Sequence, residues 1–269
     1  MSNLENKRID FFKYHACGND YVYIDCFDKI VDNPGNLAIK VSKQHFGVGS
    51  DGLILIESSK VADAKMRIFN SDGSEAKMCG NGIRCVGKHL FDEKKFSKRI
   101  SVETLSGIKY IEILNSQRQV SMVKVNMGTP EVLNQFKKSE FANISDAFYV
   151  SIGNPHCVMF FDNIESIGVC KIGEKIQNLD YFNSGVNVEF VKVNSRKDID
   201  MRVFERGSGE TLACGTGACA SVVVANFIGL CDKKVTVHLR GGDILVECID
   251  DLVYMTGEAV KVFEGNFFI

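Results

Sequence analysis

Two cysteines at matching places in the chain are the residues best suited to chemistry. Cys79 opens the sequence Cys-Gly-Asn-Gly, and Cys214 opens Cys-Gly-Thr-Gly. Each follows the same Met-Arg-x-Phe pattern, and one offset relates the cysteines and the arginines, 214 − 79 = 202 − 67 = 135 residues, which is half the chain. The repeat predicts two related halves that present one thiol each across a shared cleft. Such a pair could remove a proton from one face of a carbon and add one to the opposite face.

The glycine-rich turn after each cysteine is a favourable setting for this chemistry. If a helix begins there, its free N–H groups and positive dipole end favour a thiolate and attract a carboxylate. The same groups would stabilise the charge that develops when the carbon next to that carboxylate loses its proton. The alternative interpretation is that each cysteine only fills space after a tight turn. The matched spacing of the two copies favours the chemical interpretation, which predicts inversion of a stereocentre without a cofactor.

Other polar residues near turns have two interpretations each. His156 follows Gly-Asn-Pro at the start of an apolar strand, where it could orient a thiol or cap a turn. Glu205 and Arg206 interrupt an apolar run just before the second cysteine motif. They could be site residues, or they could form an ion pair on the surface. Four asparagines lie beside a glycine or turn, where asparagine is common for backbone reasons: Asn19, Asn70, Asn154 and Asn187.

The elements that must position these residues are mostly strands. Short runs of β-branched and aromatic residues recur along both halves, whereas helical patterns are few. Residues 82–91 and 217–230 follow the two cysteines and are too long and apolar for edge strands, so each predicts a helix enclosed by other elements. Residues 36–46 and 163–178 predict a pair of outer helices. The fold expected is α+β, with two pseudo-symmetric halves, each a mostly antiparallel sheet curled around a central helix.

The repeat also predicts the division of the chain. We expect one half to comprise residues 1–122 with the tail 260–269 and to carry Cys79, and the other to comprise 123–259 and to carry Cys214. The tail is assigned to the first half because an exposed Phe-Phe-Ile end would be unfavourable.

Composition narrows the function classes. A net charge of −2 gives no electrostatic reason to expect nucleic acid or a membrane surface as partner. The first ten residues are polar, and no apolar run reaches the length of a membrane span, so a cytoplasmic protein is expected. The ten cysteines contain no C-x-x-C pair, which argues against a metal site and a disulfide framework. All cysteines except Cys79 and Cys214 are predicted to be small core residues.

Several motifs together resemble the diaminopimelate epimerase family from about Phe11 to the C-terminus. These motifs are His-Ala-Cys-Gly-Asn-Asp at 15–20, Phe-Asn-Ser-Asp-Gly-Ser-Glu at 69–75, Met-Cys-Gly-Asn-Gly-Ile-Arg-Cys at 78–85, Gly-Asn-Pro-His-Cys at 153–157 and Glu-Arg-Gly-Ser-Gly-Glu-Thr-Leu-Ala-Cys-Gly-Thr-Gly at 205–217. Some family members carry glutamine where Gly52 stands in this chain, so that side-chain contact is missing here.

The resemblance implies a cofactor-independent epimerase, with no metal, that interconverts LL- and meso-diaminopimelate for lysine and peptidoglycan synthesis. It assigns Cys79 and Cys214 as the acid/base pair, with His156 and Glu205 assisting. It also implies a homodimer. The residues it assigns to the reacting carboxylate are Gly80, Asn81, Gly215 and Thr216, through their amides. The residues it assigns to the rest of the substrate are Asn19, Asn70, Asn154, Asn187, Glu205 and Arg206.

Three alternatives remain open at this stage. A two-thiol racemase of proline or hydroxyproline would share the cysteine pair, but its small cyclic substrate has no distal amino acid group for Arg206 and the asparagines. An isomerase that uses a carboxylate in place of paired thiols is less consistent with two cysteines. A thiol-rich metal or redox protein would account for the cysteine content but not for the spacing.

Overall fold

The chain folds into two compact units. A computed structural model describes residues 8–137, 146–182 and 185–268. Unit 1 extends to Val123 and resumes at Glu258, and unit 2 runs from Lys124 to Gly257. Both units consist mainly of strands around one helix, so the predicted α+β fold of two pseudo-symmetric halves is confirmed.

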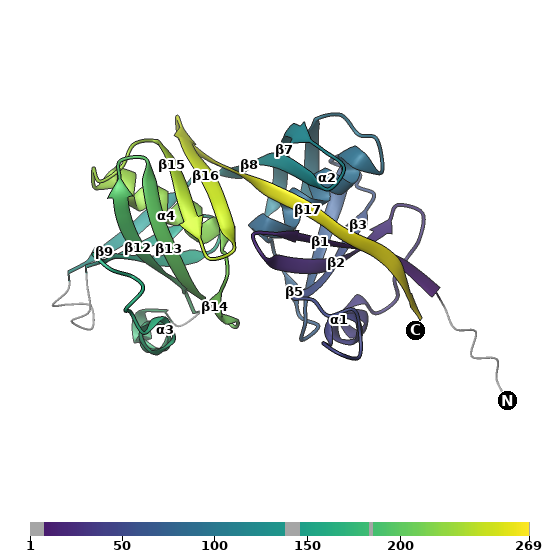
Figure 1. Cartoon of the computed structure of the whole chain (residues 1–269), viewed down its shortest axis with the longest axis horizontal. Helices are drawn as coiled ribbons and strands as arrows, with labels where there is room; N and C mark the ends of the chain where they lie inside the picture. The colour runs from purple at the N-terminus through teal and green to yellow at the C-terminus, as the bar shows by residue number, and fades with distance from the viewer. Residues whose placement is uncertain (1–7, 138–145, 183–184, 269) are drawn as a thin grey trace. The chain divides into compact units, whose positions relative to one another are not determined.

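Unit 1 forms a curled sheet (Figure 1). Its elements are β1 (Arg8–Ala16), β2 (Asn19–Cys26), α1 (Pro34–Ser42), β3 (Gly52–Glu57), β4 (Ala64–Asn70), β5 (Glu75–Ala76), α2 (Gly80–Asp92), β6 (Arg99–Thr104), β7 (Gly107–Ser116) and the start of β8 (Val120–Gly128). β1 pairs with β2, β3 with β4, and β6 with β7 in antiparallel fashion. Two parallel pairs, β2 with β3 and β4 with β6, join these hairpins into one sheet.

Unit 2 repeats this pattern strand by strand. Its elements are β9 (Glu131–Phe136), β10 (Ala147–Ser151), β11 (Pro155–Phe160), α3 (Val169–Gln177), η1 (Asp180–Phe182), β12 (Asn187–Ser195), β13 (Asp198–Glu205), β14 (Gly209–Thr211), α4 (Gly215–Phe227), β15 (Lys234–Leu239), β16 (Gly242–Ile249) and the start of β17 (Leu252–Phe268). The parallel pairs are again β11 with β12 and β13 with β15. The half-chain repeat in the sequence is therefore a repeat of topology.

A buried helix lies at the centre of each unit. α4 contacts β10, β11, β12, β13, β15 and β16, and its residues Gly215 to Ala225 are all buried. α2 contacts β1, β2 and β7 and is likewise buried from Gly80 to Leu90. Unlike α4, α2 encloses charged side chains, among them Arg84 and Lys88. Both helices begin directly after their cysteine, so the predicted position of Cys79 and Cys214 at the helix N-termini is confirmed.

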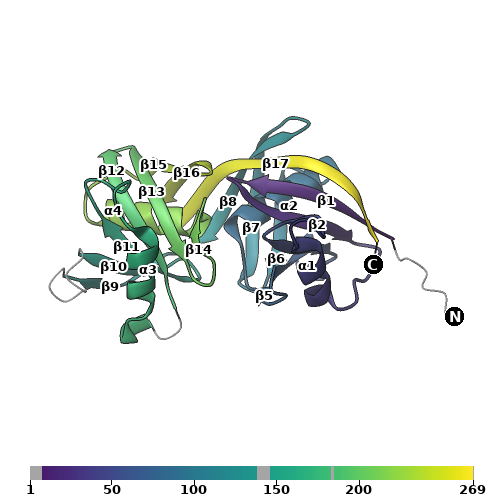
Figure 2. The same ribbon diagram turned by 60° about the horizontal axis from the view of Figure 1, so that its bottom comes forward.

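The outer helices are shorter than predicted. α1 packs on β3 and β4, and α3 packs on β12, β13 and β14 (Figure 2). The predicted range 163–178 was too long at its N-terminal end. There the Asn163 side chain accepts the Glu165 N–H, and Ile167 N–H donates to the Ile164 carbonyl, which forms turns before Gly168 opens the helix.

The C-terminal part of β17 belongs to unit 1. It lies antiparallel to β1, with Arg8 opposite Phe268 and Phe11 opposite Gly265. The Phe267 side chain packs against the apolar core formed by β1, β2, β3 and α1, whereas Phe268 is 62% exposed. Ile269, the last residue of the expected tail, lies outside the described residues.

Among the described residues no disulfide links the cysteines. Most of the cysteines are buried, as predicted. Cys170 is an exception, because it lies on the exposed face of the amphipathic helix α3, and Cys248 is only partly buried near the end of β16. The prediction that both belong to the core was therefore wrong. Across the described residues, none of the helices has the length and apolar character that crossing a membrane requires.

Candidate active site

Both candidate cysteines occupy the N-cap position of a central helix. Cys79 precedes α2 with φ −134° and ψ 119°, and its sulfur accepts the Gly82 N–H at 3.3 Å. Cys214 precedes α4 with φ −125° and ψ 111°, and its sulfur accepts the Gly217 N–H at 3.4 Å. The sulfur thus stands where a serine or aspartate oxygen normally caps a helix. Each thiol faces free N–H groups at the positive end of a helix dipole.

The repeated arginine and glutamate form an ion pair that leads into each cysteine. In unit 1, Arg67 on β4 donates to Glu75 on β5 at 2.8 Å. In unit 2, Arg202 on β13 donates to Glu210 on β14 at 2.9 Å. Each pair ties a short hairpin whose second strand ends a few residues before the cysteine. The constant spacing seen in the sequence therefore reflects a structural clasp in both units.

Asn19 connects Cys79 to the Asp51 carboxylate in unit 1. The Cys79 sulfur donates to Asn19 Oδ1 at 3.4 Å, and Asn19 Nδ2 donates to Asp51 Oδ2 at 2.7 Å. Asp51 also accepts the backbone N–H of Asp20 at 3.0 Å. Burial raises the pKa of the Asp51 carboxyl, although these hydrogen bonds oppose the rise. Asn19, predicted as a substrate ligand, is therefore oriented beside the thiol.

The first turn of α2 is held by Arg84. This side chain is fully buried, and its Nη2 donates to Asn81 Oδ1 at 3.0 Å. Its Nη1 donates to the Gly80 carbonyl at 3.4 Å, and its Nε to the Glu258 carbonyl at 3.2 Å. The Asn81 side chain is therefore engaged inside the unit. The backbone N–H groups of Gly80 and Asn81 are those that a helix start leaves without an internal acceptor.

Asn70 and Gly52 lie side by side on paired strands. Asn70 donates through its amide to Ser74 Oγ at 3.0 Å, a bond within the turn that follows β4. Gly52 pairs with Tyr21 on one side and Asn70 on the other. A Cβ atom at position 52 would lie 2.2 Å from the Phe69 carbonyl oxygen and 2.9 Å from the Tyr21 ring. This backbone can therefore hold only glycine at that position without moving.

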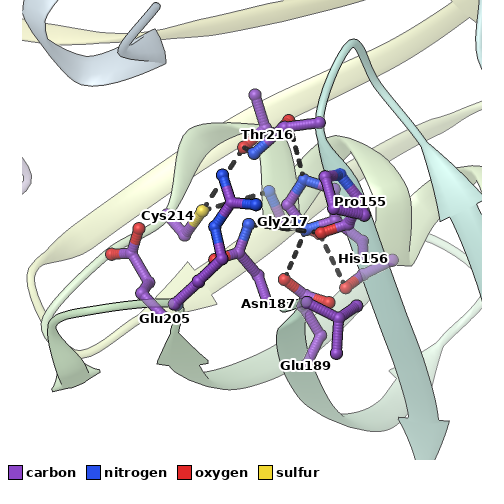
Figure 3. A network of polar contacts seen from close by, with 12 residues as sticks. Pro155, His156, Asn187, Glu189, Glu205, Cys214, Thr216 and Gly217 are labelled. Atoms are coloured by element: carbon purple, nitrogen blue, oxygen red, sulfur yellow. Dashed lines mark hydrogen bonds and ion pairs between the residues drawn. The ribbon is translucent and has the colours of Figure 1, made fainter. Parts of the chain in front are cut away.

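In unit 2 the side chains of four predicted site residues form one hydrogen-bonded path (Figure 3). The Cys214 sulfur lies 3.4 Å from Thr216 Oγ1, which accepts the Asn154 amide at 3.3 Å. Asn154 Oδ1 lies 3.0 Å from His156 Nε2. The opposite ring nitrogen of His156, Nδ1, lies 2.6 Å from Glu189 Oε1.

Glu205 lies beside Cys214. Its carboxylate accepts the Thr211 hydroxyl at 2.5 Å. Burial raises its pKa, and the negative charge of Glu189 adds to the rise, while hydrogen bonds from Thr211 and Cys214 oppose it. The Glu205 residue is half-buried, so its carboxyl group is partly shielded from solvent.

Asn187 and Arg206 are joined through the backbone. Asn187 Oδ1 accepts the Arg206 N–H at 2.9 Å, and its amide donates to the Pro155 carbonyl at 3.3 Å. Asn187 thus fixes the strand ends around His156. The Arg206 residue is exposed, and its aliphatic stem packs against the backbone at Gly185.

The two thiols have different surroundings despite the shared backbone. Burial raises the pKa of Cys214 well above its usual value, and the charges of Glu205 and Glu189 raise it further. Hydrogen bonds from Thr216 and Gly217 act in the opposite direction but do not prevail. At Cys214 burial and the neighbouring carboxylates therefore oppose the expected effect of the helix terminus on the thiol pKa. Cys79 is only partly buried.

Three polar residues near these thiols were not singled out from the sequence. Glu189 interrupts the apolar strand β12, and Arg84 interrupts the apolar helix α2, so a charge at a position that must be buried was the available signal. Tyr21 occupies in unit 1 the position of His156 in unit 2, 156 − 21 = 135 residues apart. Burial raises the Tyr21 pKa well above its usual value, and the charge of nearby Cys79 adds to the rise. The offset of the repeat could have identified this tyrosine.

Solved structures with a similar fold include several isomerases. A hydroxyproline epimerase from Agrobacterium vitis superposes with a TM-score of 0.73 at 11% identity, covering 100% of this chain and 94% of that one. A PhzF-family phenazine biosynthesis protein from Bacillus anthracis gives 0.74 at 19% identity, covering 98% and 100%. At this identity the likeness shows the fold alone. The protein thus has the two-unit fold found in these epimerases and PhzF proteins.

Sequence comparison is more specific. The model of the diaminopimelate epimerase family matches residues 11–133 and 148–262. A diaminopimelate epimerase from Acetivibrio thermocellus is 49% identical over 95% of this chain and 97% of its own length, and one from Methanococcus maripaludis is 46% identical over 95% and 98%. The chain belongs to the diaminopimelate epimerase family.

Proposed function

We propose that the protein is an isomerase that epimerises LL-diaminopimelate to meso-diaminopimelate at the α-carbon, a step of lysine and peptidoglycan precursor synthesis. The observation that carries the proposal is the pair of cysteine-capped central helices in a chain of this family. An α-proton next to a carboxylate is weakly acidic, so its removal needs a base and a site that stabilises the resulting negative charge. Each unit offers one thiol together with free helix N–H groups.

In the proposed reaction the two thiols act on opposite faces of the α-carbon. One cysteine, as the thiolate, accepts the α-proton, and the carbanion takes a proton from the thiol of the other cysteine on the opposite face. The reverse reaction exchanges these roles. No bond to a cofactor is needed at any step.

The reacting carboxylate is proposed to bind at the two helix starts. Backbone N–H groups there have no acceptor within the helix and lie at the positive end of its dipole. They would hold the carboxylate and strengthen their bonds as charge develops during proton removal. The four residues that supply them are Gly80, Asn81, Gly215 and Thr216.

The remaining assignments follow the contacts around each thiol. His156 and Glu205 are proposed to assist Cys214, His156 through the Asn154 and Thr216 path and Glu205 from beside the sulfur. Asn19 already contacts Cys79. The side chains proposed to bind the rest of the substrate are those of Asn19, Asn70, Asn154, Asn187, Glu205 and Arg206.

The test of the proposal replaces each thiol in turn. Cys79→Ala and Cys214→Ala are each expected to abolish inversion of LL-diaminopimelate, because proton removal and return both need a group at the α-carbon. Cys170→Ala is the matched control, since this exposed cysteine lies on α3 and should leave the rate unchanged. Circular dichroism establishes that the variants are folded. A cysteine variant that inverts the substrate at the wild-type rate would contradict the mechanism.

The same assay distinguishes the proposed function from that of a proline or hydroxyproline racemase. L-proline and hydroxyproline should show no inversion, because neither has a distal amino acid group. We also propose that the enzyme works in the cytoplasm, on a small-molecule substrate without nucleic acid or membrane partners, and as a homodimer. The support for these points is the family, and sedimentation equilibrium tests the assembly.

A further inference from the structure

Glu189 is a fully buried carboxylate with one known partner. It lies on β12, and its side chain is 0% exposed. Oε1 lies 2.6 Å from His156 Nδ1, while Oε2 has no hydrogen-bond partner among the described residues. A buried charge is strongly unfavourable unless it is paired. The contact with His156 must therefore account for the presence of Glu189.

The fold itself does not require a carboxylate at this position. The repeat offset relates Glu189 to Ile54, 189 − 54 = 135 residues, and the paired registers agree, with Glu189 opposite Val203 and Ile54 opposite Ile68. A Cβ atom added to the third residue of each central helix would meet these side chains at the same distance, 2.7 Å from Ile54 Cδ1 in unit 1 and 2.7 Å from Glu189 Oε1 in unit 2. The same niche thus holds an apolar group in unit 1 and a carboxylate in unit 2.

The His156 ring lies between two oxygen atoms. Nδ1 faces the Glu189 carboxylate, and Nε2 faces the carbonyl oxygen of the Asn154 side chain, 3.0 Å away. An amide oxygen and an ionised carboxylate can only accept, so the geometry fits a ring in which both nitrogens donate, an imidazolium paired with Glu189. Asn154 Oδ1 is then held toward the ring, which directs its amide to Thr216 and fixes the path to Cys214 (Figure 3).

Charged and titratable groups face Glu189 from the elements that pack around it. His156 and Cys157 are on β11, Glu205 is on β13, and Cys214 precedes α4. Burial, followed by the Glu189 charge, raises the pKa of Cys157 well above its usual value, and the same charge contributes at Glu205 and Cys214. Among these groups only His156 can neutralise the carboxylate.

We infer that Glu189 is a positioning residue for the reaction: it keeps His156 doubly protonated and oriented, and thereby aligns the Asn154 and Thr216 path that ends at Cys214. The catalytic part of this role rests on the proposed function. Its structural part, the paired imidazolium, can be measured without substrate.

The first measurement uses the full-length wild-type protein labelled with ¹⁵N-histidine. The chain has five histidines, so a His156→Gln spectrum suffices to assign the His156 signals. At neutral pH we expect both ring nitrogens of His156 to show the chemical shifts of protonated nitrogen. A neutral ring, with either nitrogen unprotonated, would overturn the inference whatever the activity of the enzyme.

The second measurement compares Glu189→Gln with two other variants. Glutamine can still accept the Nδ1 proton but lacks the charge, so the imidazolium loses its counter-ion and gives up a proton at lower pH. The kcat of Glu189→Gln should fall about 10- to 100-fold at neutral pH, by analogy with the loss seen when a carboxylate that orients a metal-binding histidine is removed. Its loss of activity with rising pH should begin at lower pH than in the wild type, and KM should change little. Glu189→Asp should restore part of the activity.

The control variant is Glu247→Gln. Glu247 is also a carboxylate of unit 2, but it pairs with Lys124 and Lys234 outside the site, so its loss should leave the pH profile unchanged. A wild-type profile in Glu189→Gln would overturn the inference. If Glu189→Gln does not fold, the ¹⁵N spectrum of the wild type decides. Failure of the wild type to invert LL-diaminopimelate would refute the proposed function instead, and the spectrum would separate the two outcomes.

Discussion

Gly82→Ala tests how the first turn of α2, and with it Cys79, is packed. Gly82 is the third residue of the helix and donates its N–H to the Cys79 sulfur. A Cβ atom there would lie 2.7 Å from Ile54 Cδ1 and 3.5 Å from Cys79 Cβ. Ile54 is fully buried, so its side chain has little room to withdraw. The helix start or the strand must therefore shift.

The expected loss follows from two opposing effects. Overpacking of a tight core costs about 1–3 kcal/mol. Alanine in place of glycine in a helix regains about 1 kcal/mol. Gly82→Ala should therefore lower the free energy of unfolding by up to ~2 kcal/mol. Ile54→Val removes the clashing atom and alone costs about 0.5–1.5 kcal/mol, yet in the Gly82→Ala background it should be neutral or stabilising.

Urea unfolding followed by circular dichroism measures all four states of this double-mutant cycle. We expect a coupling of about 1 kcal/mol or more between positions 82 and 54. Ile56→Val is the matched control, because Ile56 is equally buried on β3 but is not among the nearest neighbours of the added atom. Its effect should add to that of Gly82→Ala within about 0.5 kcal/mol. A Gly82→Ala protein that is more stable than the wild type, or a cycle without coupling at Ile54, would refute this account of the packing.

Three further predictions concern the clasps, Cys214 and Gly52. Glu210→Gln should cost ~3 kcal/mol in urea unfolding, since it leaves Arg202, whose side chain is 8% exposed, without its carboxylate. The equivalent Glu75→Gln in the more exposed pair of unit 1 should cost less than ~1 kcal/mol, and equal losses would contradict the burial argument. Because its pKa is raised, Cys214 should be alkylated by iodoacetamide at a rate that keeps rising above the pH at which a free cysteine levels off; a plateau at the free-cysteine pH would contradict this. Gly52→Gln should lower the thermal midpoint sharply, because its Cβ meets the carbonyl on β4, and an unchanged midpoint would show that the strands can separate.

The sequence could predict those elements that occur in both halves and that have a clear local pattern of apolar residues and glycines. The apolar run after Cys214 required an enclosed helix, and the glycine turn before it required the cysteine at the N-terminus, as α4 shows. The same reasoning placed α2 after Cys79. Where the local pattern was amphipathic, as in α3, burial was predicted less well, and Cys170 was wrongly assigned to the core.

The polar partners of the site could not be predicted from local patterns. Glu189 meets His156 because β11 and β12 pair in parallel, which brings together residues 33 positions apart in the chain. Parallel pairing leaves no hairpin signal between the two strands. Asp51 reaches Asn19 in the same way across β2 and β3. Such contacts depend on register, and only the offset between the halves hints at them.

The central claim is that two thiols exchange the α-proton of diaminopimelate from opposite faces. Incubation of the protein with LL-diaminopimelate in D₂O, without added cofactor, tests it most directly through deuterium content and stereochemistry at the α-carbon. We predict that every inverted molecule carries deuterium at that carbon, and that Cys79→Ala and Cys214→Ala produce no inverted molecules. Inversion with the original hydrogen retained, or no exchange with the wild-type protein, would contradict the account.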